Sequence, residues 1–149
     1  MNNINIYLHF EGNCKEAFDF YQAVFQTEIL HTSLFSEMPQ NNDGNDHCTV
    51  EENDKDKIMH ISLPINDRFV LMGCDTIGSQ TERHNPGNNF ALSVNPETLK
   101  EAERVFAALS DGGEVTMPLE KSFWGSYFGM LTDPFGIQWM VNFEIPQDE

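Results

Sequence analysis

The sequence predicts an α+β fold made of two paired βαβββ modules. Three observations carry this prediction: apolar and polar residues alternate in several short stretches, two longer stretches have helical spacing, and the order strand, helix, strand, strand, strand occurs twice. The two copies start about 85 residues apart. We therefore expect one domain over residues 1–149, with module one at about 1–75, a linker at about 76–88, and module two at about 89–145.

Module one begins with a half-buried strand over residues 4–10, whose two faces differ. One face carries Ile4, Ile6, Leu8 and Phe10, and the other carries Asn5, Tyr7 and His9. Asn13 then suits an N-cap, and the apolar stripe of 14–25 predicts a helix. Further strands are expected over 27–35, 59–65 and 68–74.

Module two repeats this order. Residues 88–94 predict a strand with Phe90, Leu92 and Val94 on one face and Asn89, Ala91 and Ser93 on the other. Asn95 and Pro96 are expected to cap and start a helix that ends before the glycines at 112–113. Strands are expected over 114–119, 126–133 and 137–143, the last with core residues Ile137, Trp139, Val141 and Phe143.

Two segments between these elements are polar. Residues 39–57 are acidic and lack the carboxylate spacing of a calcium loop, so we interpret them as a solvated loop. Residues 76–88 are rich in turn-forming residues and are expected to join the modules.

Composition excludes several classes of function. The net charge of −16, from 24 acidic and 8 basic residues, would repel nucleic acid and anionic membranes. No apolar stretch approaches the roughly 20 residues that span a bilayer. Cys14, Cys48 and Cys74 form no CxxC pair, which favours a reducing, cytoplasmic location without a disulfide framework.

The strand faces that the helices leave uncovered are polar but almost uncharged. They carry Asn5, Tyr7 and His9 in module one, and Asn89, Ala91, Ser93, Gln138, Met140 and Asn142 in module two. Such side chains suit the lining of a ligand cavity, although a sheet packed on a partner subunit fits nearly as well. The aromatic bend with Phe123, Trp124, Tyr127 and Phe128 could cover a pocket or lie in a dimer interface.

Several blocks of the chain resemble one known family. They are FEGNCKEAFDFYQAVF, MHISLPI, RFVLMG, NNFALSV and GGEVTMPLEKSFWGSYFGMLTDPFGIQWMVNF. Together they resemble the vicinal oxygen chelate superfamily, which includes glyoxalase and bleomycin-resistance-like proteins, and within it the PhnB-type branch, often labelled 3-demethylubiquinone-9 3-methyltransferase-like. The resemblance implies that the two modules form a cup-shaped mixed sheet that holds a small molecule.

The resemblance also implies four positions for a divalent metal, one on the first and one on the last strand of each module. They fall on Asn5, Met72, Asn89 and Met140. Amides and thioethers are poor ligands for such ions, so we predict no metal there and no cofactor. No GxGxG loop follows a strand, so no nucleotide-cofactor cradle is expected.

His9 and His60 are the candidate catalytic residues, because imidazoles on the uncovered face could move a proton. The alternative is that each is a hydrogen-bonded interior histidine. Candidate ligand-binding residues are Asn5, Tyr7, Met72, Asn89, Ser93, Trp124, Tyr127, Gln138 and Met140. Cys74 is interpreted as a small apolar residue, and Asp133 as a turn former.

Three functional hypotheses follow. The first is a homodimeric protein that binds a small, partly apolar molecule without metal, with any chemistry on His9 or His60. The second is an enzyme with a relocated metal held by these histidines and Asp75 or Glu120. The third is a sequestering or resistance protein that binds its ligand without changing it.

Overall fold

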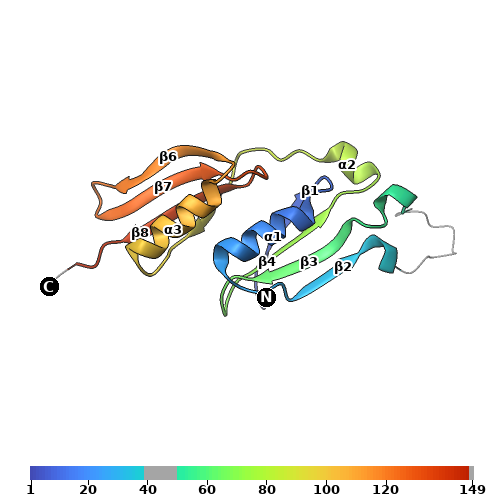
Figure 1. The fold of residues 1–149 in the computed structure, drawn as a ribbon, viewed down its shortest axis with the longest axis horizontal. Coiled ribbons are helices and arrows are strands. Elements are labelled where there is room, and N and C mark those ends of the chain that lie inside the picture. The colour runs from blue at the N-terminus through green and yellow to red at the C-terminus, as the bar shows by residue number, and fades with distance from the viewer. Residues whose placement is uncertain (39–49, 148–149) are drawn as a thin grey trace. The chain divides into compact units, whose positions relative to one another are not determined.

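The computed structural model describes residues 1–38 and 50–147, and its internal contacts divide the chain into two units, Met1–Asn85 and Pro86–Glu149. Each unit contains one four-stranded mixed sheet and one long helix, shown in Figure 1. The predicted α+β fold of two βαβββ modules is therefore confirmed. No helix among the described residues is both long and apolar enough to cross a bilayer.

The first unit follows the predicted order of elements. Its strands and helices are β1 Ile6–Phe10, α1 Cys14–Phe25, β2 His31–Leu34, β3 Ile58–Pro64, β4 Val70–Asp75 and α2 Ser79–Arg83, with short 3₁₀ turns η1 Phe35–Glu37 and η2 Glu52–Asp54. The sheet order is β1-β4-β3-β2, with β1 parallel to β4 and the other pairs antiparallel. The crossover through α1 is what allows β1 to lie parallel to β4.

Helix α1 covers one face of this sheet (Figure 1). Its apolar stripe contains no glycine or proline, and it ends where Gln26 takes a left-handed backbone (φ 56°). The buried residues between helix and sheet include Leu8, Phe10, Phe18, Tyr21, Ile61, Leu63 and Leu71. Because side chains alternate along a strand, the intervening residues of β1 and β4 lie on the opposite, uncovered face.

The buried carboxylate of Asp75 joins three elements of this unit. It is only 2% exposed and accepts backbone hydrogen bonds from Gly12 (2.9 Å), Cys14 (3.0 Å) and Ile58 (2.9 Å). The end of β4 is thereby tied to the turn before α1 and to the start of β3. Asn13 is the N-cap residue, as predicted, but its side chain makes no capping bond, and Asp75 satisfies the first helical N–H instead.

The second unit contains β5 Leu92–Val94, α3 Leu99–Ser110, β6 Glu114–Lys121, β7 Ser126–Thr132 and β8 Gln138–Glu144. Its sheet order is β5-β8-β7-β6, which repeats the arrangement of the first unit. Asp133 forms the predicted turn by accepting the N–H groups of Phe135 (2.8 Å) and Ile137 (3.0 Å). Its second oxygen accepts the indole N–H of Trp139 (2.8 Å), which fixes this core ring.

Three details of the predicted elements were wrong. Ile4 and Phe90, expected in the core, precede β1 and β5 and are 78% and 56% exposed. Both strands are shorter than the apolar alternation suggested, because pairing with β4 and β8 begins only at Ile6 and Leu92. Helix α3 starts at Leu99, because the Thr98 hydroxyl rather than Asn95 accepts the capping bond, from the Glu101 N–H.

The polar segments also differ from expectation. Of the acidic segment 39–57, residues 39–49 lie outside the described residues, and Cys48 with them. The remainder is not wholly solvated, because Asp54 is 9% exposed and pairs with Lys57 at 2.7 Å. The linker at 76–88 contains α2 and the buried Ile77, so part of it packs on the first unit.

Asp75→Asn is expected to destabilise the protein by about 3 kcal/mol, because buried charge-assisted hydrogen bonds to backbone N–H groups are lost. The amide has one acceptor oxygen, and its NH₂ group would face N–H donors. Urea unfolding followed by circular dichroism measures the difference. Asp67→Asn, at an exposed turn, is the matched control and should change stability by less than about 0.5 kcal/mol. Equal stability of the two variants would contradict the role given to Asp75.

Gly73→Ala is expected to cost about 1–3 kcal/mol, because the packed core leaves no room for a methyl group. A Cβ at this position would lie 2.7 Å from Phe18 Cε2 and 3.0 Å from the Leu8 carbonyl oxygen. The same substitution in a Phe18→Leu background should cost less, since the ring is the nearer obstacle. A double-mutant cycle of urea unfolding measures this, and additive costs would show that the ring is not the obstacle.

Candidate functional site

The uncovered face of the first sheet gathers polar and aromatic side chains from all four strands. Strand register places Tyr7 opposite Met72, Met72 opposite Ser62, and Ser62 opposite His31. One step along the same face, His9 lies opposite Cys74, and His60 lies opposite Ser33. None of these eight residues is Asp, Glu, Lys or Arg, although the chain has a net charge of −16.

Four of these side chains form two hydrogen-bonded pairs. The Tyr7 hydroxyl lies 3.3 Å from His60 Nδ1, and the Cys74 sulfur lies 3.4 Å from His9 Nδ1. Contacts between rings connect the two pairs. The Tyr7 ring centroid lies 5.2 Å from that of His9 and 5.8 Å from that of His60. The His31 ring lies 6.0 Å from that of His60 and extends the cluster to the edge strand.

Tyr7 and Cys74 are both held in their protonated forms. Partial burial raises the pKa of the Tyr7 phenol well above its ordinary value, and a hydrogen bond with the Cys74 sulfur adds to the effect. Burial also raises the pKa of the Cys74 thiol, with the Tyr7 hydrogen bond opposing it and the Asp75 charge adding to it. The phenol and the thiol of the cluster therefore carry no charge near pH 7.

Each histidine of the cluster is bonded to a group that can both donate and accept. The Tyr7 hydroxyl can donate to His60 Nδ1 or accept from it, and the Cys74 thiol stands in the same relation to His9 Nδ1, so the direction of each bond follows the histidine tautomer. In either tautomer these bonds use Nδ1, and the second ring nitrogen, Nε2, takes no part in them.

The structure brings together four of the predicted site residues in module one, namely Tyr7, His9, His60 and Met72. Asn5 precedes β1 and is exposed. Sequence reasoning missed Cys74 and His31 as members of the cluster. The alternation of side chains along a strand could have identified Cys74, because it lies two residues after Met72 and therefore on the same face of β4.

In module two, Ser93, Gln138 and Met140 share the uncovered face of the second sheet. Ser93 lies opposite Met140 on β8, and Gln138 lies two residues before it. Asn89 precedes β5 and is exposed. Tyr127 lies opposite Phe143, in the alternation that includes the buried Val141, so register places it on the helix side.

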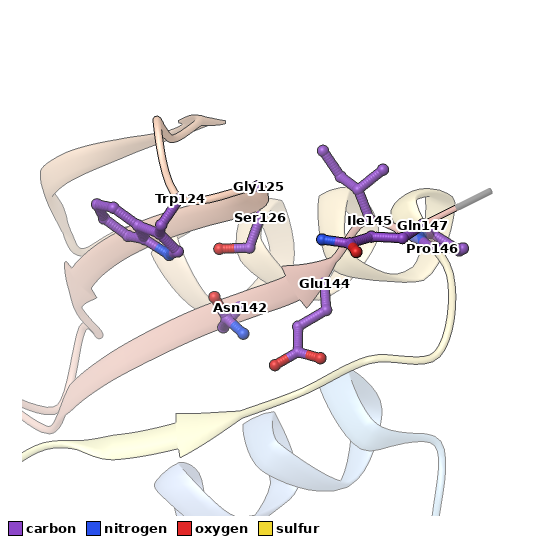
Figure 2. A pocket seen from close by; sticks show the side chains of 8 residues that line it. All are labelled: Trp124, Gly125, Ser126, Asn142, Glu144, Ile145, Pro146 and Gln147. Atoms are coloured by element: carbon purple, nitrogen blue, oxygen red, sulfur yellow. The ribbon is translucent and has the colours of Figure 1, made fainter. Parts of the chain in front are cut away.

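Trp124 lies in the hairpin between β6 and β7 and lines a hollow of about 480 Å³. Figure 2 shows this hollow between Trp124, the side chains of Ser126, Asn142 and Glu144, and the residues that follow β8. All of the lining residues belong to the second unit. Of the four aromatic residues of the predicted bend, Trp124 is the one that lines this hollow.

The metal positions implied by family resemblance do not fit a divalent ion. Asn5 and Asn89 lie outside the strands, and Met72 and Met140 offer only thioether sulfur. The relocated site with Asp75 is not formed either, because both Asp75 oxygens accept backbone bonds on the helix side of the sheet, away from His9. Within the described ranges, no group of three His, Cys, Asp or Glu side chains could hold a metal.

Comparison with known proteins agrees with this architecture. The model of the Glyoxalase/Bleomycin resistance protein/Dioxygenase superfamily matches residues 3–141. The chain therefore belongs to this superfamily, and the resemblance inferred from its sequence blocks is confirmed.

Three individual proteins of similar sequence or structure are also found. Protein YjdN of Escherichia coli strain K12 is 31% identical over 138 residues, which are 91% of both chains. The crystal structure of protein PA1353 from Pseudomonas aeruginosa is 37% identical with a TM-score of 0.75, over 95% of this chain and 98% of that one. A Bacillus cereus PhnB protein, titled a putative 3-demethylubiquinone-9 3-methyltransferase, is 27% identical with a TM-score of 0.73 over the same shares.

Tyr7 is expected to stay protonated well above pH 10. Because its pKa is raised in the folded state, its contribution to stability is intact below about pH 10 and is lost as pH rises further. Absorbance near about 295 nm, which reports phenolate, should titrate identically in wild type and Tyr7→Phe up to about pH 11. A step near pH 10 that the substitution removes would contradict the raised pKa. Far-UV circular dichroism checks that the variant is folded.

Proposed function

We propose that this protein binds a small, uncharged, partly apolar molecule on the uncovered face of the first-module sheet. The observation that carries the proposal is the two hydrogen-bonded couples on this face, Tyr7 with His60 and Cys74 with His9. A sheet face with polar, uncharged side chains, in a chain of net charge −16, is what a ligand-binding surface requires. Membership of the superfamily supports a binding function at the level of fold.

The chemistry of the face defines the ligand class. Imidazole N–H groups on His9 and His60 would donate to a carbonyl, hydroxyl or amide oxygen. The Tyr7 ring and the Met72 thioether would contact the apolar part of the ligand. The face has no Lys or Arg among the eight residues identified above, so a phosphonate or phosphate dianion would lack a permanent cationic partner.

Any chemistry at this site would be proton transfer by the two histidines. A neutral imidazole can take a proton from the ligand on a ring nitrogen and, as the resulting imidazolium, return it to a ligand oxygen. Covalent catalysis is disfavoured, because the raised pKa keeps Cys74 as a thiol rather than the nucleophilic thiolate. The same neutrality supports the second candidate, a sequestering protein that returns its ligand unchanged.

The proposal extends to the state of the protein in the cell. We expect a cytoplasmic homodimer, on the basis of the unpaired cysteine pattern and of the exposed apolar residues Val115 and Met117 on edge strand β6. Analytical ultracentrifugation measures the oligomeric state directly. A monomer at all concentrations tested would remove this part of the proposal.

Thermal unfolding in the presence of small molecules tests the binding function. The probe set is a panel of aromatic and aliphatic alcohols, ketones and amides, with alkyl phosphonates as the contrasting class. A ligand at 100 times its Kd should stabilise the wild type by about 2.7 kcal/mol. Tyr7→Phe and His60→Ala should weaken binding of the uncharged ligands about tenfold or more, because each removes one partner of the hydrogen-bonded couple.

The matched control is His84→Ala, which removes an imidazole that lies outside both sheets, just after α2. Ligands that stabilise this variant and wild type equally, but not His60→Ala, would support the site. Equal stabilisation of all three proteins, or preference for the phosphonates, would contradict it. Mass spectrometry of each ligand after long incubation then separates turnover from sequestration.

A further inference from the structure

A second ligand-binding feature lies in the C-terminal module, where β8 ends. The hollow beside Trp124, of about 480 Å³, adjoins another of about 360 Å³ that is lined by Asn95 and Glu97, and both are bordered by Asn142 and Glu144. The two hollows share Asn142 and Glu144 as lining residues and are together called here the β8 groove. It involves no residue of the histidine cluster, because all of its lining residues belong to the second unit.

One end of the β8 groove is aromatic. The Trp124 indole is 57% exposed, yet it is supported by two neighbours rather than left to move alone. Its ring centroid lies 5.0 Å from Phe123 at 88° and 5.9 Å from Phe128 at 62°. Such edge-to-face contacts hold the indole in place, so its face is available as a preformed surface for a ligand.

The other walls of the β8 groove are acidic and amide-bearing. Glu97 and Glu144 both line it, and within residues 1–38 and 50–147 neither makes an ion pair. No Lys, Arg or His is among its lining residues. The field of a chain with net charge −16 adds to the negative potential of these carboxylates.

Two hydrogen bonds connect residues that line the β8 groove. The Ile145 N–H donates to the Gly125 carbonyl at 3.2 Å, which ties the segment after β8 to the aromatic hairpin. The Asn142 amide donates to the Asn95 side-chain oxygen at 3.4 Å, and both side chains line the smaller hollow. This bond uses the Asn142 NH₂ group, so its amide oxygen is the acceptor for a ligand.

We infer that the β8 groove binds an organic ammonium ion, with its charge against Glu144 and its alkyl groups against the Trp124 indole. An exposed tryptophan face combined with nearby carboxylates is the arrangement that attracts such cations. Anionic ligands are excluded by Glu97 and Glu144. The inference goes beyond the proposed function, because it concerns a different module and a ligand of different charge.

Choline and its uncharged isostere 3,3-dimethylbutan-1-ol are the probes for this test. The chain has two tryptophans, and the indole N–H of Trp139, held by Asp133, is an internal reference that should not move. In ¹H–¹⁵N spectra of the full-length protein, choline should shift the Trp124 indole signal in a saturable way. The neutral isostere should bind about tenfold more weakly, because the cation–π and carboxylate contacts need the charge.

Matched variants distinguish binding at the β8 groove from nonspecific attraction of a cation to an acidic protein. Glu144→Gln keeps the shape of the side chain and should weaken choline binding about tenfold. Glu114→Gln changes the net charge equally, at the far end of β6, and should leave the affinity within about twofold. Trp124→Leu should weaken binding about three- to tenfold, measured by saturation transfer to the choline methyl signal.

Three results would overturn the inference: equal binding of choline and its isostere, equal effects of the Glu144 and Glu114 substitutions, or no shift of the Trp124 indole. Failure here is distinguishable from failure of the proposed function. The Tyr7→Phe and His60→Ala variants should bind choline as the wild type does, and Glu144→Gln should still be stabilised by the uncharged ligands of the first site.

Discussion

The buried Asp75 carboxylate is the interaction on which the first module depends. Its two oxygens accept three backbone N–H groups, from the turn before α1, the first residue of α1 and the first residue of β3. A charged group can be buried only when such partners replace its water, so the three segments must meet at the end of β4. That meeting point fixes the register of β1 and β3 against β4, and hence which side chains share the uncovered face.

The same register separates two kinds of chemistry across one strand. Asp75 is oriented toward the helix side, whereas Cys74, one residue earlier, lies on the uncovered face beside His9. The Asp75 carboxylate stabilises the fold through its backbone hydrogen bonds, and the eight residues of the uncovered face include no carboxylate, Lys or Arg. In the second module, carboxylates have both kinds of role. Glu97 and Glu144 border the β8 groove, whereas Asp133 accepts hydrogen bonds from its own turn and from the Trp139 indole.

Much of the fold could be predicted from local patterns. The apolar stripe of 14–25 predicted α1 to the residue, and the alternation in β3, β4, β7 and β8 was long enough to place those strands within about two residues. The errors fell at strand and helix ends. Alternation continued through Ile4 and Phe90, but no partner strand extends that far, and Asn95 lost the capping role to Thr98. Pairing and capping are decided by neighbours that a local pattern does not contain.

The sequence by itself determined the α+β class, the doubled order of elements, the family, and the absence of charged side chains from the uncovered face of the first sheet. Those properties follow from periodicity and residue type, which are local. Only the tertiary structure decided that Cys74 pairs with His9, that Tyr7 contacts His60, and that Asn142 and Glu144 border a groove beside Trp124. These contacts join residues from different strands, and their distances depend on strand register and backbone ties.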